Sequence, residues 1–164
     1  MRSLIAFPLL FLVAILQSAL FSRLSLLNGH ADLMLIVLAI WSTHPRVAHA
    51  WEWTLIGAML IAFLSAFPWP LTFLLYLIPT ALAQTLRAAL RSHVLSTLIV
   101  LFTGTLLMGL LGWGYLFILQ STFSVSDIFG EIVSPSLLLN ILLTLPAFIL
   151  ITRLANWVYP GEEE

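Results

Sequence analysis

Two residue types are missing from this chain altogether, and charge of either sign is scarce. The 164 residues include no cysteine and no lysine, and charged residues make up 8% of them. Without cysteine the chain has no disulfide, no thiolate nucleophile and no cysteine metal site. It also lacks the dense basic face of nucleic-acid-binding proteins, so we expect no nucleic-acid partner. Hydrophobic residues account for 62% of the chain. A soluble domain of this length could not bury so many, which makes lipid the natural solvent.

Catalytic motifs are lacking as well. The sequence contains no HExxH, no GxSxG and no phosphate-binding P-loop. His44 and His49 are five positions apart, so they would not share a helical face, and both are predicted to be solvated loop residues. We therefore expect no enzymatic activity, no cofactor and no metal site.

Long apolar runs dominate what is present, and about nineteen helical residues match the ~30 Å hydrocarbon core of a bilayer. The pattern predicts an all-α polytopic membrane protein, a bundle of about six transmembrane helices in a single integral membrane domain over residues 1–164. A cleavable signal peptide is disfavoured, because no small-residue cleavage site follows the first run. The expected spans are 4–22, 31–43, 51–67, 71–86, 95–119 and 135–156.

Arginine placement predicts the orientation of the bundle. With six spans and a cytoplasmic N-terminus, five arginines face the cytoplasm and Arg23 alone lies outside, which is the positive-inside bias. Both termini are therefore expected in the cytoplasm. Several tryptophans near the span ends fit an aromatic belt at the two membrane surfaces. The cytoplasmic arginines are Arg2, Arg46, Arg87, Arg91 and Arg153, and the belt tryptophans are Trp41, Trp51, Trp53, Trp69 and Trp157.

Polar residues inside the apolar runs are the candidate functional positions. Asn140 and Gln17 carry amides that need partners in hydrocarbon, either a neighbouring helix of the same bundle or a partner protein or small ligand. Asp32 suits the first turn of the second helix. Pro146 is expected to kink the last helix, and Arg153 to reach the cytoplasmic surface from its end.

Small residues at four-residue spacing form a further candidate contact surface. Ala58, Ala62 and Ala66 would lie on one face of the third span and allow close helix packing, mostly within the bundle. Glycines loosen the fifth span. Between the fifth and sixth spans, the stretch from Asp127 to Val133 favours a short helix on the membrane surface, with a plain loop as the alternative.

Four stretches together resemble the rod shape-determining protein MreD family. The last of them carries an asparagine, a proline and a closing arginine in the family's order. Ala31 stands where the family usually has proline, and the end of the third span lacks an aspartate that the family often has. The stretches are LQSALFSRL (16–24), ADLMLIVLAIW (31–41), HPRV (44–47) and SPSLLLNILLTLPAFILITRL (134–154).

The resemblance implies a non-enzymatic subunit of the bacterial cell-elongation machinery in the inner (cytoplasmic) membrane. Such a subunit would bind MreC, and through it act with the peptidoglycan polymerase and transpeptidase of elongation and with MreB filaments, so shaping the cell. The competing class is the small-molecule-binding S-component of an energy-coupling factor transporter, which has a similar size and span number. Candidate interface or structural residues are Gln17, Asp32, Arg46, Asn140, Pro146 and Arg153.

Overall fold

The computed structural model of this protein describes residues 2–21, 25–26, 28–119, 126 and 128–159. Arg23 and Asp127, which entered the sequence predictions, lie outside these residues. Within the described ranges, the regular secondary structure is helical except for a two-stranded hairpin. The elements are α1 (Arg2–Leu16), the π-helical η1 (Gln17–Phe21), β1 (Ser25–Leu26), β2 (Gly29–His30), α2 (Leu33–Thr43), α3 (Ala50–Leu64), α4 (Trp69–Ala89), α5 (His93–Ile118), the π-helical η2 (Ile128–Val133) and α7 (Ser134–Val158).

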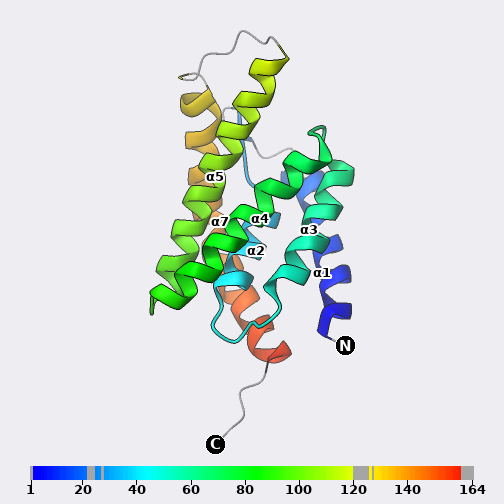
Figure 1. The fold of residues 1–164 in the computed structure, drawn as a ribbon, viewed down its shortest axis with the longest axis vertical. Coiled ribbons are helices and arrows are strands. Elements are labelled where there is room, and N and C mark those ends of the chain that lie inside the picture. The colour runs from blue at the N-terminus through cyan, green and yellow to red at the C-terminus, as the bar shows by residue number, and fades with distance from the viewer. Residues whose placement is uncertain (1, 22–24, 27, 120–125, 127, 160–164) are drawn as a thin grey trace, which may run out of the picture.

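The six longer helices among the described residues alternate in direction along the bundle (Figure 1). One end of the bundle holds the start of α1, the end of α7 and the turns 44–49 and 90–92; we call it the arginine end. The opposite end holds the β1–β2 hairpin and the α3–α4 connection, and we call it the hairpin end. The arginine-bearing turns thus share one end with the start of α1 and the end of α7.

Three helices are long and apolar enough to cross a membrane within the part of the chain that the structure describes. They are α4, α5 and the continuous helix formed by η2 and α7, Ile128–Val158. Three more helices are apolar but shorter, covering Ile5–Ala19, Leu33–Thr43 and Ala50–Leu64. The chain is therefore an all-helical protein with membrane-spanning helices.

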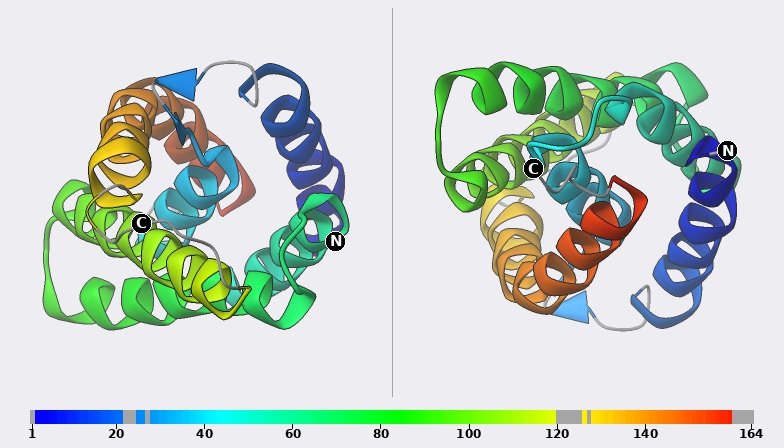
Figure 2. Two further views of the ribbon diagram at one scale, coloured as in Figure 1. Left: turned by 90° about the horizontal axis from the view of Figure 1, so that it is seen from above. Right: turned by 90° about the horizontal axis from the view of Figure 1, so that it is seen from below.

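The short helix α2 forms the centre of the bundle. Every residue from Met34 to Thr43 is buried, and α2 contacts each of the other five helices. The end-on views in Figure 2 show α2 ringed by its neighbours. A helix that is apolar on all faces is stable only when it is surrounded, which explains this position. Its 11 residues rise only about 16 Å, roughly half the thickness of the hydrocarbon core of a bilayer.

Several sequence predictions are corrected by this arrangement. The stretch 128–133 is not a separate surface helix, because η2 runs directly into α7 and its Ile128 and Val133 are buried. Helix α3 ends at Leu64, so Ala66 is outside the helix that was expected to carry it. His44 is only 3% exposed and is not a solvated loop residue.

The tryptophans divide into two groups. Trp51, Trp69 and Trp157 are exposed, as an aromatic belt requires. Trp41 and Trp53 are instead inside the bundle, at 0% and 1% exposure, with their rings stacked at a centroid distance of 3.7 Å. Proximity to a helix end did not distinguish the two groups, because burial depends on which face the neighbouring helices cover.

Candidate functional site

Asp32 lies at the start of α2 and is the centre of a buried polar network. One carboxylate oxygen accepts a hydrogen bond from the backbone N–H of Leu35 at 2.9 Å, which confirms the predicted N-cap. The hydroxyl of Tyr76, on α4, donates to the same carboxylate at 3.0 and 3.3 Å. Asp32 is 5% exposed and Tyr76 is 2% exposed, so both groups are held inside the protein.

Asn140 joins α7 to this network. Its side-chain oxygen accepts from the backbone N–H of Asp32 at 2.8 Å, and its amide nitrogen donates to the hydroxyl of Thr105 on α5 at 3.0 Å. Only 1% of Asn140 is exposed. Of the two roles that the sequence left open, the hydrogen bonds therefore give Asn140 the internal one. A single amide ties together α2, α5 and α7.

Gln17 reaches the same region from the other side. It lies in η1, just past α1, and its side-chain oxygen accepts from the backbone N–H of Met34 at 2.8 Å. With Asp32 capping Leu35, two of the free N–H groups in the first turn of α2 have side-chain partners. Three residues proposed from sequence, Gln17, Asp32 and Asn140, thus meet around one helix start.

The hairpin end is tied to α7 next to this network. The backbone N–H of His30 donates to the Ser136 hydroxyl at 2.9 Å, and the Asn28 amide donates to the Glu131 carboxylate at 2.9 Å. Gly29 is packed so closely here that a side-chain carbon at this position would lie 2.6 Å from the backbone nitrogen of Ser136. Only glycine fits this contact.

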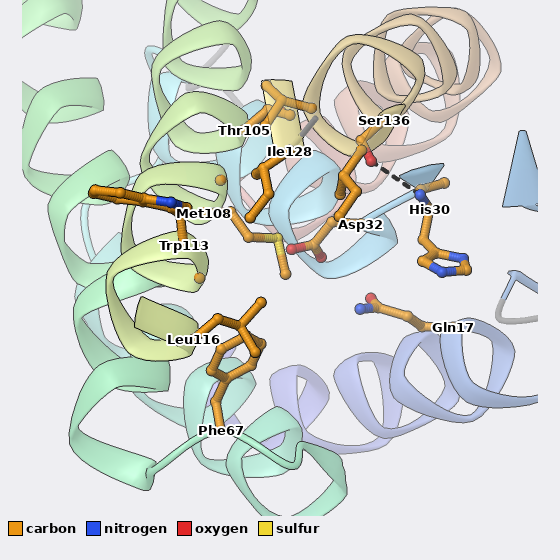
Figure 3. A pocket seen from close by; sticks show the side chains of 15 residues that line it. Gln17, His30, Asp32, Phe67, Thr105, Met108, Trp113, Leu116, Ile128 and Ser136 are labelled. Carbon is orange, nitrogen blue, oxygen red and sulfur yellow. Dashed lines mark hydrogen bonds between the residues drawn. The ribbon is translucent and has the colours of Figure 1, made fainter. Parts of the chain in front are cut away.

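A cavity of about 270 Å³ lies directly beside Asp32 (Figure 3). Its walls are mainly apolar, and Asp32, Gln17 and His30 provide polar groups on one side. Figure 3 shows the Asp32 carboxylate and the Gln17 amide pointing toward the space between them and the apolar wall. The remaining lining residues are Ala31, Phe67, Thr105, Met108, Gly109, Gly112, Trp113, Leu116, Ile128, Ile132, Val133 and Ser136.

Glycine-rich α5 supplies one wall of the cavity. Gly112 has only the Phe67 ring edge, at 3.7 Å, near the position of a side-chain carbon. Gly109 differs, because a side chain there would overlap Val133 of η2. These two glycines of α5 therefore have different roles. Gly109 allows η2 to pack closely against α5, and Gly112 leaves space in the cavity.

The arginine end is closed by different contacts. Arg87 of α4 donates to the backbone carbonyls of His44 and Val47, which fixes the turn between α2 and α3. Hydroxyl pairs join neighbouring helices nearby, Thr43 with Thr97 and Thr54 with Thr80, each at 2.8 Å. Tyr159 at the end of α7 lies against Trp41, with ring centroids 6.1 Å apart.

His44 is held neutral at this end. Burial away from water, helped by the positive charges of His93, Arg46 and Arg87, lowers the pKa of His44 from 6.5 to about 4. Its ring meets that of His93 edge-on at a centroid distance of 5.1 Å. No group of three potential metal-ligating side chains was found in the described residues. His93 is also held by a hydrogen bond of 3.1 Å between its Nε2 and the Ile40 carbonyl oxygen.

The other residues proposed from sequence lie apart from the cavity. Arg46 and Arg153 are exposed, and Pro146 is exposed within α7, which continues through it as one helix. Of the small residues, Ala58 is fully buried, Ala62 is half-buried and Ala66 is exposed. The predicted close-packing face of α3 is therefore buried at Ala58 and becomes exposed toward the hairpin end.

Tyr76 and Thr105 are network residues that the sequence did not single out. Both sit in long apolar helices, where one hydroxyl carries little signal. Their significance comes from their partners, Asp32 and Asn140, which are 44 and 35 residues away. Gly57 was also missed: a side-chain carbon there would lie 3.0 Å from the Met34 sulfur and 3.2 Å from Leu38, so α3 packs closely on α2 at this point.

The fold and site define a class of protein: an all-helical membrane protein whose buried central helix begins beside a cavity large enough for a small molecule or a few side chains. No protein-family model matches the chain, and neither a curated protein nor a solved structure does.

Proposed function

We propose that this protein is a non-enzymatic, multi-pass subunit of the bacterial inner membrane that acts in cell elongation, as the MreD family does. Its direct partner would be MreC, and through MreC it would influence the peptidoglycan polymerase and transpeptidase and the MreB filaments. The proposed orientation places the arginine end in the cytoplasm and the hairpin end outside.

One observation carries the proposal. Three of the four stretches that resemble the family each contribute a polar residue to the start of α2. Gln17 comes from the stretch 16–24, Asp32 from 31–41 and Asn140 from 134–154, and each is linked to that start by a hydrogen bond of 2.8 or 2.9 Å. Residues that are far apart in the sequence thus form one structural unit. This supports the view that the separate resemblances come from one family and not from chance.

The test is co-purification. The chain, tagged at its C-terminus, is expressed with and without the MreC of the same bacterium and extracted in mild detergent. We expect MreC to be retained at a fixed ratio, while an unrelated single-span membrane protein expressed at the same level is lost. A monodisperse, folded preparation that retains no MreC would contradict the proposal.

A second candidate function is favoured by the cavity. An S-component binds a small molecule in a pocket that opens outward, and the cavity of about 270 Å³ at the hairpin end has the mainly apolar lining with a few polar groups that is typical of a site for a small ligand. This alternative predicts that the purified protein carries a bound small molecule. Mass spectrometry of the denatured preparation, compared with a cavity-filled Gly112→Leu variant, would detect it.

A further inference from the structure

We propose that the cavity at the hairpin end binds a positively charged, hydrogen-bond-donating group, an ammonium or guanidinium on an apolar stem, with Asp32 as its counter-charge. This goes beyond either function proposed above. It holds for a free amine and for a lysine or arginine side chain of a protein partner, because both present the same chemistry.

The first step concerns charge. Asp32 is 5% exposed, and its carboxylate lies inside a predominantly apolar helical bundle with neutral polar partners. The described arginines near the helix ends lie at the arginine end, away from the cavity. Arg46 and Arg91 are in the two turns there, and Arg87 and Arg153 are near the ends of α4 and α7. A buried acidic group with no arginine beside it among the described residues is a costly arrangement in a membrane protein and usually has a function.

The second step concerns hydrogen bonds. An ionised carboxylate can accept about four hydrogen bonds. Besides the Leu35 N–H and the Tyr76 hydroxyl, the Gln17 side chain and the Met34 N–H also hydrogen-bond to the Asp32 carboxylate. The partial positive charge of the α2 N-terminus adds to these but does not replace a full counter-charge. All four of these donors are neutral, so none of them supplies a counter-charge to an ionised Asp32.

The third step concerns the shape of the space. The carboxylate is at one side of the cavity, and Phe67, Met108, Trp113 and Leu116 form the opposing wall (Figure 3). Aromatic faces also attract cations. A volume of about 270 Å³ accommodates one short stem with a charged head, and exposed His30 among the lining residues places the cavity within reach of the surface. The lining therefore matches an amine with an apolar body.

Three probes of nearly equal shape test the proposal: 2-phenylethylammonium, neutral 2-phenylethanol and anionic 3-phenylpropanoate. Each is titrated into the detergent-purified full chain by calorimetry and by its effect on the melting temperature. We expect the ammonium probe to bind at least about tenfold more tightly than the alcohol, and the carboxylate probe to bind most weakly.

The decisive variant is Asp32→Asn. Asparagine caps helices as well as aspartate does, so this change removes the charge and keeps the cap. We expect it to abolish the preference for the ammonium while leaving alcohol binding in place. Gly112→Leu, which fills the cavity and leaves Asp32 intact, should weaken the binding of both the ammonium and the alcohol. Equal binding of ammonium and alcohol to the native chain, or a preference that survives Asp32→Asn, would overturn the proposal.

The source of the cationic group is identified in a second arm. MreC is co-purified with the native chain and with Asp32→Asn. Loss of MreC from the variant assigns the group to a partner side chain, whereas unchanged MreC together with lost ammonium binding assigns it to a free amine. If MreC binds neither protein, the proposed function fails while the probe titrations still decide the cavity chemistry.

Discussion

The two ends of this bundle are built on different principles. At the arginine end, Trp41 and Trp53 stack inside the protein, hydroxyl pairs join the helices, and Arg87 fixes the α2–α3 turn. At the hairpin end, the start of α2 is buried, the side chains of Gln17 and Asn140 from two other segments accept hydrogen bonds from its backbone, and a cavity remains beside it. Large interlocking side chains fill space, whereas a glycine-rich wall leaves it open. The arginine end is therefore closed by side-chain packing, whereas the hairpin end keeps vacant space beside Asp32.

The largest expected effect is at the arginine end. Trp41→Ala removes a fully buried indole from the stack with Trp53, and losses of ~3–5 kcal/mol are typical of such truncations. We expect a marked fall in stability, measured by unfolding in denaturing detergent. Trp157→Ala is the matched control, because that side chain is 71% exposed, and it should change stability little. Equal effects of the two variants would mean that the stack does not hold this end together.

Gly29→Ala is expected to have the second-largest effect on stability, and it acts at the hairpin end. The added carbon would lie 2.6 Å from the Ser136 nitrogen and 2.8 Å from the Ile132 carbonyl oxygen, both backbone atoms that cannot rotate away. Overpacking of this kind costs ~1–3 kcal/mol. Gly114→Ala has nothing within 4 Å and serves as the control, with unchanged or slightly improved stability. Melting temperatures of the two variants in one detergent provide the comparison.

Asn140→Leu tests whether the polar network is internal. The change leaves the Asp32 N–H and the Thr105 hydroxyl without this partner, and hydrogen bonds of this type contribute ~0.6–2 kcal/mol in membranes. We expect a lower melting temperature with unchanged retention of MreC per folded molecule. Leu142→Ala, an exposed position on the same helix, should change neither quantity. Intact stability together with lost MreC would instead make Asn140 an interface residue.

The smallest effect is a pH dependence that His44 contributes at the arginine end. Because the folded pKa of His44 is about 4 and its usual value is 6.5, the unfolded chain binds the proton more readily between these values. Stability should therefore be complete above pH 6.5 and decline as the pH falls toward 4. His44→Gln should flatten this part of the profile, which melting curves across the range would reveal. An unchanged slope in the variant would assign the pH dependence to other groups.

The sequence anticipated much of the candidate site but not its geometry. Asp32 was correctly placed at a helix start, because an acidic residue before an apolar run is a local signal. Gln17 and Asn140 stood out because amides are rare in hydrocarbon. Nothing local could show that they converge on α2, since the bond between Asn140 and Asp32 joins residues 108 positions apart. Tyr76 was missed for the same reason: its importance comes entirely from its partner.

By itself the sequence determined the solvent and the class of the fold. Its apolar runs require lipid and helices, because a backbone in hydrocarbon must satisfy its own hydrogen bonds. The tertiary structure alone decided that the shortest run, α2, is the central helix, that Trp41 and Trp53 face inward, and that a cavity forms beside Asp32. The physical reason is that hydrophobic periodicity and composition are local properties, set within a few neighbouring residues. Burial and vacant space depend instead on how all the helices pack together.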